Sequence, residues 1–98
     1  MRRVYVHVGK VCSYYMQPKI VMYVAENCSD VDLARAVLEN RGLKWQEIDI
    51  ERDMAAREQV IAWTGGRPAT PTIWIGETML VEPSARRLSA ALDEALNQ

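Results

Sequence analysis

The segment from Lys19 to Ala25 (Lys-Ile-Val-Met-Tyr-Val-Ala) is almost continuously apolar and rich in β-branched residues. Such a run is typical of a strand that is buried on both faces. We therefore expect it in the interior of a sheet, covered on each side by other elements. Its apolar part, Ile20 to Ala25, is far too short to cross a bilayer.

Beyond this strand, the hydrophobic periodicity alternates between the helical and the extended type. The predicted order is strand, helix, strand, helix, strand, strand, helix, over residues 19–25, 30–40, 43–50, 53–64, 72–75, 78–81 and 82–96. Alternating strands and helices imply parallel pairing with right-handed crossovers, and the two adjacent strands near the end imply an antiparallel hairpin. The predicted fold class is α/β, with a four-stranded mixed sheet and helices on both faces.

The first 18 residues have a different pattern. Arg2 to Val8 alternates like a strand, Gly9-Lys10 is suited to a turn, and Val11 to Tyr15 has the composition of a second strand. Pro18 cannot extend a ladder and ends the segment. We interpret residues 1–18 as a β-like N-terminal extension to a domain over residues 19–98. The extension could add an edge strand, join two chains in a dimer or be partly disordered.

The length and net charge of the chain limit the number of domains and the classes of partner to be expected. The chain has 98 residues, enough for one domain, and a net charge of −1 gives no electrostatic reason to expect nucleic acid or an anionic membrane as partner. No apolar block with a small-residue cleavage site follows Arg2 and Arg3, so we expect a cytoplasmic protein. Two cysteines, Cys12 and Cys28, and one histidine, His7, predict neither a disulfide framework nor a metal site.

Cys28 is the residue best placed for chemistry. It follows the predicted buried strand and precedes a predicted helix, which Asn27 or Ser29 could cap. The unpaired N–H groups and the dipole of a helix N-terminus stabilise a thiolate, the form that attacks disulfides. The carboxylates of Glu26, Asp30 and Asp32 oppose this effect and repel anionic thiols. Alternatively, Cys28 is a small residue in an inactive fold.

Three patterns, in order, resemble the glutaredoxin family over residues 19–96. They are Ile-Val-Met-Tyr-Val-Ala-Glu-Asn-Cys-Ser-Asp-Val at residues 20–31, Arg-Gly-Leu-Lys-Trp-Gln-Glu-Ile-Asp-Ile-Glu-Arg-Asp at 41–53, and Thr-Gly-Gly-Arg-Pro-Ala-Thr-Pro-Thr-Ile at 64–73. Residues 65–84 resemble the mycoredoxin-like branch. The resemblance implies a thioredoxin-like fold, a nucleophilic Cys28 and a cis-proline at Pro71, with the Thr70 backbone aimed at the substrate.

The same resemblance suggests binding residues for a low-molecular-weight thiol, either glutathione or a mycothiol-like compound, as co-substrate without a tightly bound cofactor. The candidates are Asn27, Arg67, Thr70, Pro71 and Ser84. Arg67 could pair with a ligand carboxylate or be a solvated loop residue, and Ser84 could bind a carboxylate or only cap the last helix. Without the resemblance, Pro71 would be interpreted as a trans proline that opens a strand.

The departures from the family pattern restrict the mechanism. Val31 stands at the position of the usual resolving cysteine, which leaves a monothiol route on mixed disulfides between proteins and small thiols. Ala25 stands where the family often has a lysine, three residues before the nucleophile. Glu82-Pro83-Ser84 stands where the family usually has Gly-Gly followed by paired acidic residues. Cys12 could resolve Cys28 if the extension reached it, or it could be a buried apolar residue.

The function predicted from the sequence is a monothiol thiol-disulfide oxidoreductase. Three alternatives remain open: a non-catalytic binding module of the same fold, an iron–sulfur cluster carrier formed by two chains, and the N-terminal module of a glutathione-transferase-like protein. Against the cluster carrier, Cys28-Ser-Asp-Val lacks the Gly-Phe-Ser that follows the cysteine in the glutaredoxins that carry such clusters. Against the transferase-like module, we expect no helical second domain after these residues.

Overall fold

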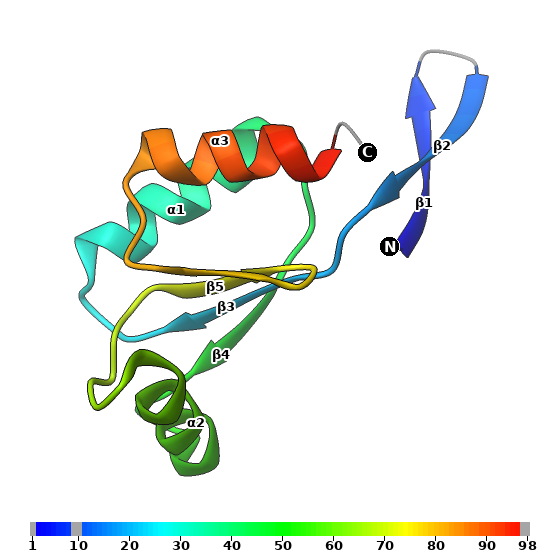
Figure 1. Cartoon of the computed structure of the whole chain (residues 1–98). Helices are drawn as coiled ribbons and strands as arrows, with labels where there is room; N and C mark the ends of the chain where they lie inside the picture. The colour runs from blue at the N-terminus through cyan, green and yellow to red at the C-terminus, as the bar shows by residue number, and fades with distance from the viewer. Residues whose placement is uncertain (1, 9–10, 97–98) are drawn as a thin grey trace.

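A computed structural model describes residues 2–8 and 11–96 of the chain (Figure 1). Its elements are β1 (Arg2–Val8), β2 (Val11–Gln17), β3 (Ile20–Val24), α1 (Ser29–Asn40), β4 (Gln46–Asp49), α2 (Met54–Thr64), β5 (Thr72–Ile75), β6 (Thr78–Val81) and α3 (Ala85–Leu96). The predicted elements are therefore all present, with shifted ends. The strand predicted over 43–50 is the most shortened, and the turn predicted at Gly9-Lys10 lies outside the described residues.

The main sheet has the strand order β4-β3-β5-β6. β3 pairs in parallel with β4 and antiparallel with β5, and β5 pairs antiparallel with β6. Helices α1 and α3 cover one face of the sheet and α2 lies on the other (Figure 1). The prediction that the run 19–25 forms an interior strand between the second strand and the hairpin is confirmed, as is the four-stranded mixed sheet.

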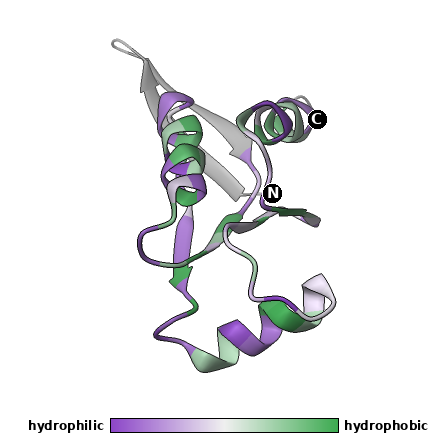
Figure 2. Cartoon of the chain, turned by 90° about the vertical axis from the view of Figure 1, so that its left-hand side faces the viewer, coloured by the Kyte–Doolittle hydropathy of each residue, from purple (hydrophilic) through white to green (hydrophobic). Residues whose placement is uncertain are grey.

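The core lies between the sheet and the pair α1 and α3. Alternate residues of β3 point to it and are buried, as are apolar residues of β5, β6 and both helices. Along α1, hydrophobic residues recur at helical spacing and face the core, while the hydrophilic residues between them face solvent (Figure 2). The central members of this core are Met22, Val31, Leu38, Ile73, Leu88 and Leu92.

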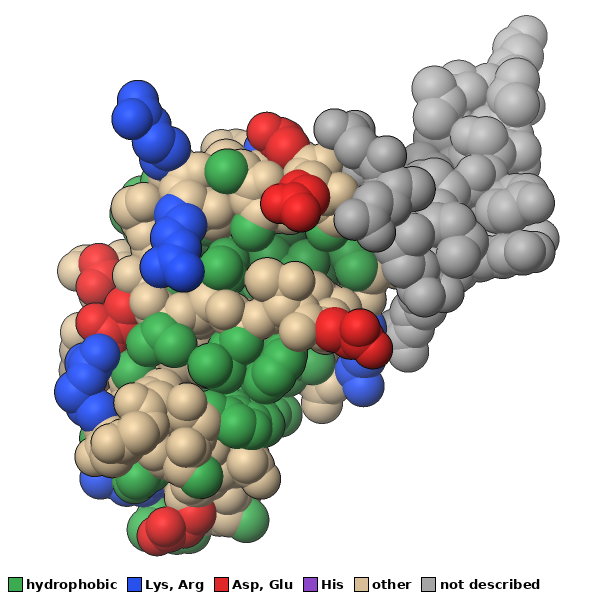
Figure 3. Space-filling model, viewed as in Figure 1, with side chains coloured by type: hydrophobic (Ala, Val, Ile, Leu, Met, Phe, Trp, Pro, Cys, Tyr) green, Lys and Arg blue, Asp and Glu red, His purple; other side chains and the backbone are tan. Residues whose placement is uncertain are grey.

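The opposite face of the sheet is covered less completely. Trp63 of α2 packs edge-on against Tyr23 of β3, with ring centroids 5.3 Å apart, and against Trp74 of β5 at 5.2 Å. Burial, with a smaller contribution from the charge of Asp53, raises the pKa of the Tyr23 phenol. Apolar side chains remain visible at the surface where the sheet meets α2 (Figure 3).

The ends of α1 and α2 show which of the capping residues expected from the sequence are found in the structure. Asp53 caps α2, since its Oδ1 accepts a hydrogen bond from the Ala56 N–H at 3.0 Å, and Gly65 ends that helix with φ 81°. The expectation that Asn27 or Ser29 caps α1 is wrong. Cys28 itself holds the N-cap position without a side-chain cap, because Ser29 is already helical and Asn27 has φ 56° instead of the extended backbone of a capping residue.

The N-terminal strands β1 and β2 form a separate two-stranded antiparallel sheet, in which His7 lies opposite Cys12. At its end, the Gln17 side chain is buried and donates a hydrogen bond to the Lys44 carbonyl at 2.9 Å. This hairpin joins β3 at the end opposite to Cys28 (Figure 1). The arrangement gives no support to an intrachain disulfide between Cys12 and Cys28. Over the described residues, no helix is long and apolar enough to cross a membrane.

Candidate active site

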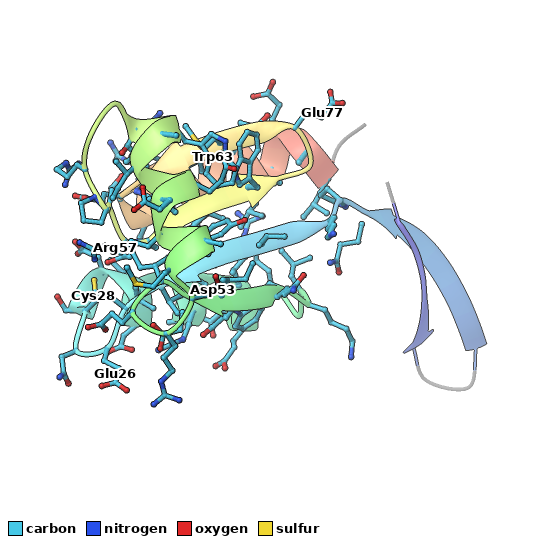
Figure 4. All side chains as sticks on the ribbon, turned by 90° about the horizontal axis from the view of Figure 1, so that it is seen from below. Glu26, Cys28, Asp53, Arg57, Trp63 and Glu77 are labelled. Carbon is cyan, nitrogen blue, oxygen red and sulfur yellow. The ribbon has the colours of Figure 1, made fainter. Side chains whose placement is uncertain are left out.

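Cys28 lies where the chain leaves β3 and enters α1 (Figure 4). Its carbonyl oxygen accepts hydrogen bonds from the N–H groups of Val31 at 3.1 Å and Asp32 at 3.2 Å, which begins the helix. Its side chain is half-buried and packs against the edge of the core. The sulfur therefore lies at a helix N-terminus, with the partial positive charge of the helix dipole behind it.

The loop before β5 brings Thr70 to this sulfur. Sγ of Cys28 lies 3.7 Å from the Thr70 carbonyl oxygen and 3.7 Å from the Thr70 hydroxyl oxygen. The carbonyl can accept from the thiol S–H, while the hydroxyl can donate to the sulfur. The following Thr70–Pro71 peptide bond is cis, and Pro71 is fully buried. The structure thus brings Cys28, Thr70 and Pro71 together.

Arg67 and Ser84 make contacts within the protein. The Arg67 guanidinium forms an ion pair with Glu82 at 2.5 Å, and the Glu82 N–H donates to the Pro71 carbonyl at 2.8 Å. Ser84 Oγ accepts from the Arg87 N–H at 3.1 Å, as the residue capping α3 does. The sequence pattern did not indicate Glu82 as the partner of Arg67, because the two residues are separated by the whole β5–β6 hairpin.

A pocket of ≈ 270 Å³ opens beside Cys28. Its walls come from the end of β3, the first turns of α1 and the end of β4. The lining residues are Val24, Ala25, Glu26, Asn27, Cys28, Asp32, Arg35 and Asp49. Asn27 is therefore next to Cys28 in the pocket, whereas Arg35 and Asp49 are site residues that the sequence analysis missed. Strand order alone would have placed Asp49 near this end, since β3 and β4 are parallel neighbours.

Ion pairs occupy the guanidinium groups near the pocket. Arg35 makes two hydrogen bonds of 2.8 Å to the Glu47 carboxylate and one of 3.0 Å to Asp32. The Arg35 hydrogen bonds hold the pKa of Glu47 below its usual value. Arg52 approaches Glu26 at 3.3 Å and Asp49 at 3.7 Å.

Arg57 also lies at this end of the molecule and was not predicted as a site residue. It lies in α2, one turn after Asp53, on the side of the helix toward Cys28 (Figure 4). Its side chain is half-buried, and it makes no ion pair with another described residue. Within the same described part of the chain, no group of three or more His, Cys, Asp or Glu side chains is arranged to hold a metal ion.

Residues 20–80 match the family model for glutaredoxin. The chain belongs to the glutaredoxin family. No curated protein matches its sequence. The structure resembles a thioredoxin-like protein, with a TM-score of 0.67 and 23% identity over 76% of this chain and 100% of that one. It also resembles the glutaredoxin-like NrdH-redoxin from Escherichia coli, with a TM-score of 0.66 and 22% identity over 74% and 92% of the two chains.

A third similar structure is a maleylacetoacetate isomerase from Anaeromyxobacter dehalogenans with glutathione in its active site. It has a TM-score of 0.52 and 19% identity over 85% of this chain and 40% of the isomerase. The likeness to all three structures shows the thioredoxin-like fold. The predicted fold class is therefore confirmed, and the family match over residues 20–80 confirms the predicted family.

Proposed function

We propose that this glutaredoxin-family protein is a thiol-disulfide oxidoreductase that acts through Cys28 by a monothiol mechanism, with mixed disulfides as substrates. The observation that carries the proposal is the position of Cys28 Sγ at the start of α1, 3.7 Å from both oxygens of Thr70. A half-buried sulfur in this position is accessible to a disulfide and has a donor for its anionic form.

In the first step, the Cys28 thiolate attacks the small-thiol sulfur of a mixed disulfide. A new disulfide forms between Cys28 and the small thiol, and the protein thiolate leaves and takes a proton from solvent. In the second step, the thiolate of a free small thiol attacks this disulfide. The two small thiols leave as their own disulfide, and Cys28 is a thiolate again. Electrons balance, since each step exchanges one disulfide bond for another.

The absence of a cysteine at position 31 favours this route over a dithiol one, because the buried Val31 stands where a resolving thiol would be needed. Glutathione is the co-substrate that glutaredoxins generally use, and the similar isomerase binds it. A mycothiol-like thiol is the other candidate. The setting we propose is a reducing cytoplasm, where free small thiols are available.

For ligand binding, we propose the Thr70 backbone as the partner of an extended thiol ligand, in the manner of an added strand beside Pro71. Asn27 would line the same site from the pocket side. Arg67 and Ser84 would contribute only by exchanging an internal contact for one with the ligand, because Glu82 and the α3 backbone occupy them in this structure.

The test is turnover of a peptide disulfide-linked to a small thiol, with glutathione and with a mycothiol-type thiol as reductant. Cys28→Ser should abolish turnover, and Cys12→Ser should leave most of it. A parent protein that turns over neither disulfide, and whose Cys28 reacts no faster than an unfolded thiol, would show that the enzyme proposal is wrong. That outcome would favour a non-catalytic binding module.

A further inference from the structure

The N-terminal hairpin is a sheet of only two strands. β1 and β2 pair over their whole length, and within the described residues neither pairs with a strand of the main sheet. A hairpin of two strands is marginally stable in water, and a third strand or a packed helix is what stabilises such a sheet. This hairpin projects from the domain where β2 leads into β3 (Figure 1). The outer edge of β1 is therefore open to a further strand.

The main sheet has two edge strands, which differ in charge. β4 carries Glu47 and Asp49 among its four residues, and charged side chains are a common protection of an edge against added strands. β6 has the sequence Thr-Met-Leu-Val, without a charge. In the part of the chain that the structure describes, β6 pairs only with β5. The β6 edge is thus the less protected edge of the main sheet.

The residues at the ends of β1 and β6 have opposite charges. β6 lies between Glu77 and Glu82 in the sequence, whereas β1 begins with Arg2 and Arg3 and is followed by Lys10. Glu82 is shared with Arg67, but Glu77 is exposed and makes no ion pair with another described residue.

Like charges on neighbouring strands destabilise their pairing, and opposite charges stabilise it. Two β6 strands side by side would bring acidic ends together, and two β1 strands would bring basic ends together. Pairing of β1 with β6 places basic ends next to acidic ones in either strand direction. Charge therefore favours this combination over both self-pairings.

The whole chain is divided by charge in the same sense. Residues 1–16 contain three basic residues and no acidic one. The other nine basic residues and all 13 acidic ones lie in residues 17–98, which gives that part a net charge of −4. The hairpin is thus complementary in charge to the domain of another copy of the chain.

The two open edges lie at the same end of each molecule. The N–H of Gly76, in the turn between β5 and β6, donates a hydrogen bond to the Lys19 carbonyl at 2.8 Å, in the link between β2 and β3. The base of the hairpin therefore lies next to the turn that leads into β6 (Figure 1). Two copies related by one two-fold axis can use both edges reciprocally, which closes the assembly as a dimer.

We propose that the chain forms a two-fold dimer in which β1 of each copy adds to the β6 edge of the other. β1 becomes the fifth strand of its partner's main sheet, and β2 becomes the sixth. Valine recurs at every second position of β1, at residues 4, 6 and 8, which suits a strand beside the half-buried apolar residues Met79 and Val81. The inference goes beyond the proposed function and does not depend on it.

The test is sedimentation equilibrium of the full-length chain in the Cys12→Ser background, with a reductant present so that no disulfide can join two chains. Between about 1 and 200 µM, we expect the mass to rise from the 11.2 kDa of one chain to twice that value. A chain that stays monomeric over this range would overturn the inference, as would a series of species larger than a dimer.

Charge reversal identifies the two strands in contact. Glu77→Lys should raise the dissociation constant of the dimer by about tenfold or more, since each dimer contains two such contacts and a unit charge at about 4 Å in water changes an equilibrium about fivefold. Arg2→Glu/Arg3→Glu should weaken the dimer similarly. The triple variant, with both reversals in one chain, should return to within about threefold of the parent.

A matched control is Glu39→Lys, which changes the net charge equally at an exposed position of α1, outside the proposed contact. It should leave the dissociation constant within about twofold of the parent. Circular dichroism checks that each variant is folded.

Each other outcome contradicts the assigned contact. A stronger dimer with Glu77→Lys would indicate pairing of β6 with β6, and no effect of Glu77→Lys would indicate contact through the hairpins alone. A triple variant as weak as either parent reversal, or a Glu39→Lys variant as weak as Glu77→Lys, would show that the charges do not act between β1 and β6.

Discussion

The hydroxyl of Thr70 should account for much of the reactivity of Cys28. Thr70→Val keeps the branched shape of the side chain and removes only the donor that lies 3.7 Å from Sγ. The Thr70 carbonyl, at the same distance, is unchanged by this substitution and cannot donate to a thiolate. The thiolate therefore loses its one identified side-chain donor among the described residues.

The size of the effect follows from the geometry. A hydrogen bond to a charged acceptor contributes about 1.5–3 kcal/mol, and a long contact to sulfur in a half-exposed site belongs at or below the lower end. We expect a loss of about 1.4 kcal/mol, which is about a tenfold decrease in the alkylation rate of Cys28 near neutral pH. Thr70→Ser keeps the hydroxyl and should stay within about threefold of the parent.

The assay is the second-order rate of alkylation by iodoacetamide, a neutral reagent, in the Cys12→Ser background. Neutrality of the reagent avoids charge effects of the carboxylates that line the pocket. Circular dichroism of each variant checks that the fold is retained. A Thr70→Val rate equal to that of the parent would refute the assigned role, as would a Thr70→Ser rate as low as that of Thr70→Val.

Three further predictions concern stability and are measured by chemical denaturation. Glu47→Gln should lower the free energy of unfolding by about 0.5–1 kcal/mol at pH 7, since the pair with Arg35 is partly exposed. Because Arg35 lowers the folded-state pKa of Glu47 below 4.5, this stabilisation is present above pH 4.5 and is lost as the pH falls through the lowered value, so parent and variant should converge in acid. Asp53→Ala, which removes the cap of α2, should cost about 1 kcal/mol, and Asp53→Asn much less. Leu92→Ala, at a fully buried position of α3, should cost about 2–5 kcal/mol, whereas the same change at the exposed Leu33 should cost under about 1 kcal/mol.

The fold was largely predictable from the sequence, because its signals are local and strong. The apolar run 19–25 required burial on both faces, and β3 is indeed flanked by β4 and β5. Gly42 and Gly65 stand where left-handed backbone follows a helix, with φ 66° and 81°. The strand predicted over 43–50 shortened to Gln46–Asp49, the residues that pair with Val21–Val24 of β3. The apolar residues Leu43 and Ile50 on either side of it are buried without being part of the strand, so their periodicity did not mark its ends.

The details of the site were less predictable, because they depend on contacts between distant segments. Cys28 was identified from its place between a strand and a helix, but its approach to Thr70 joins residues 42 positions apart. The pairing of Arg67 with Glu82 and the pocket walls from Arg35 and Asp49 likewise require the tertiary structure. The N-cap of α1 was mispredicted because Asn27 has a left-handed backbone, and the sequence around it did not indicate this conformation.

The missing side-chain cap of α1 has an energetic consequence for the whole protein. A residue such as Ser or Asp at the N-cap contributes about 1 kcal/mol to helix stability, and Cys28 makes no such hydrogen bond. The nucleophile thus occupies a position that a purely structural sequence would give to another residue, a trade of stability for activity. Cys28→Ser and Cys28→Asp should therefore be inactive but more resistant to thermal denaturation than the parent.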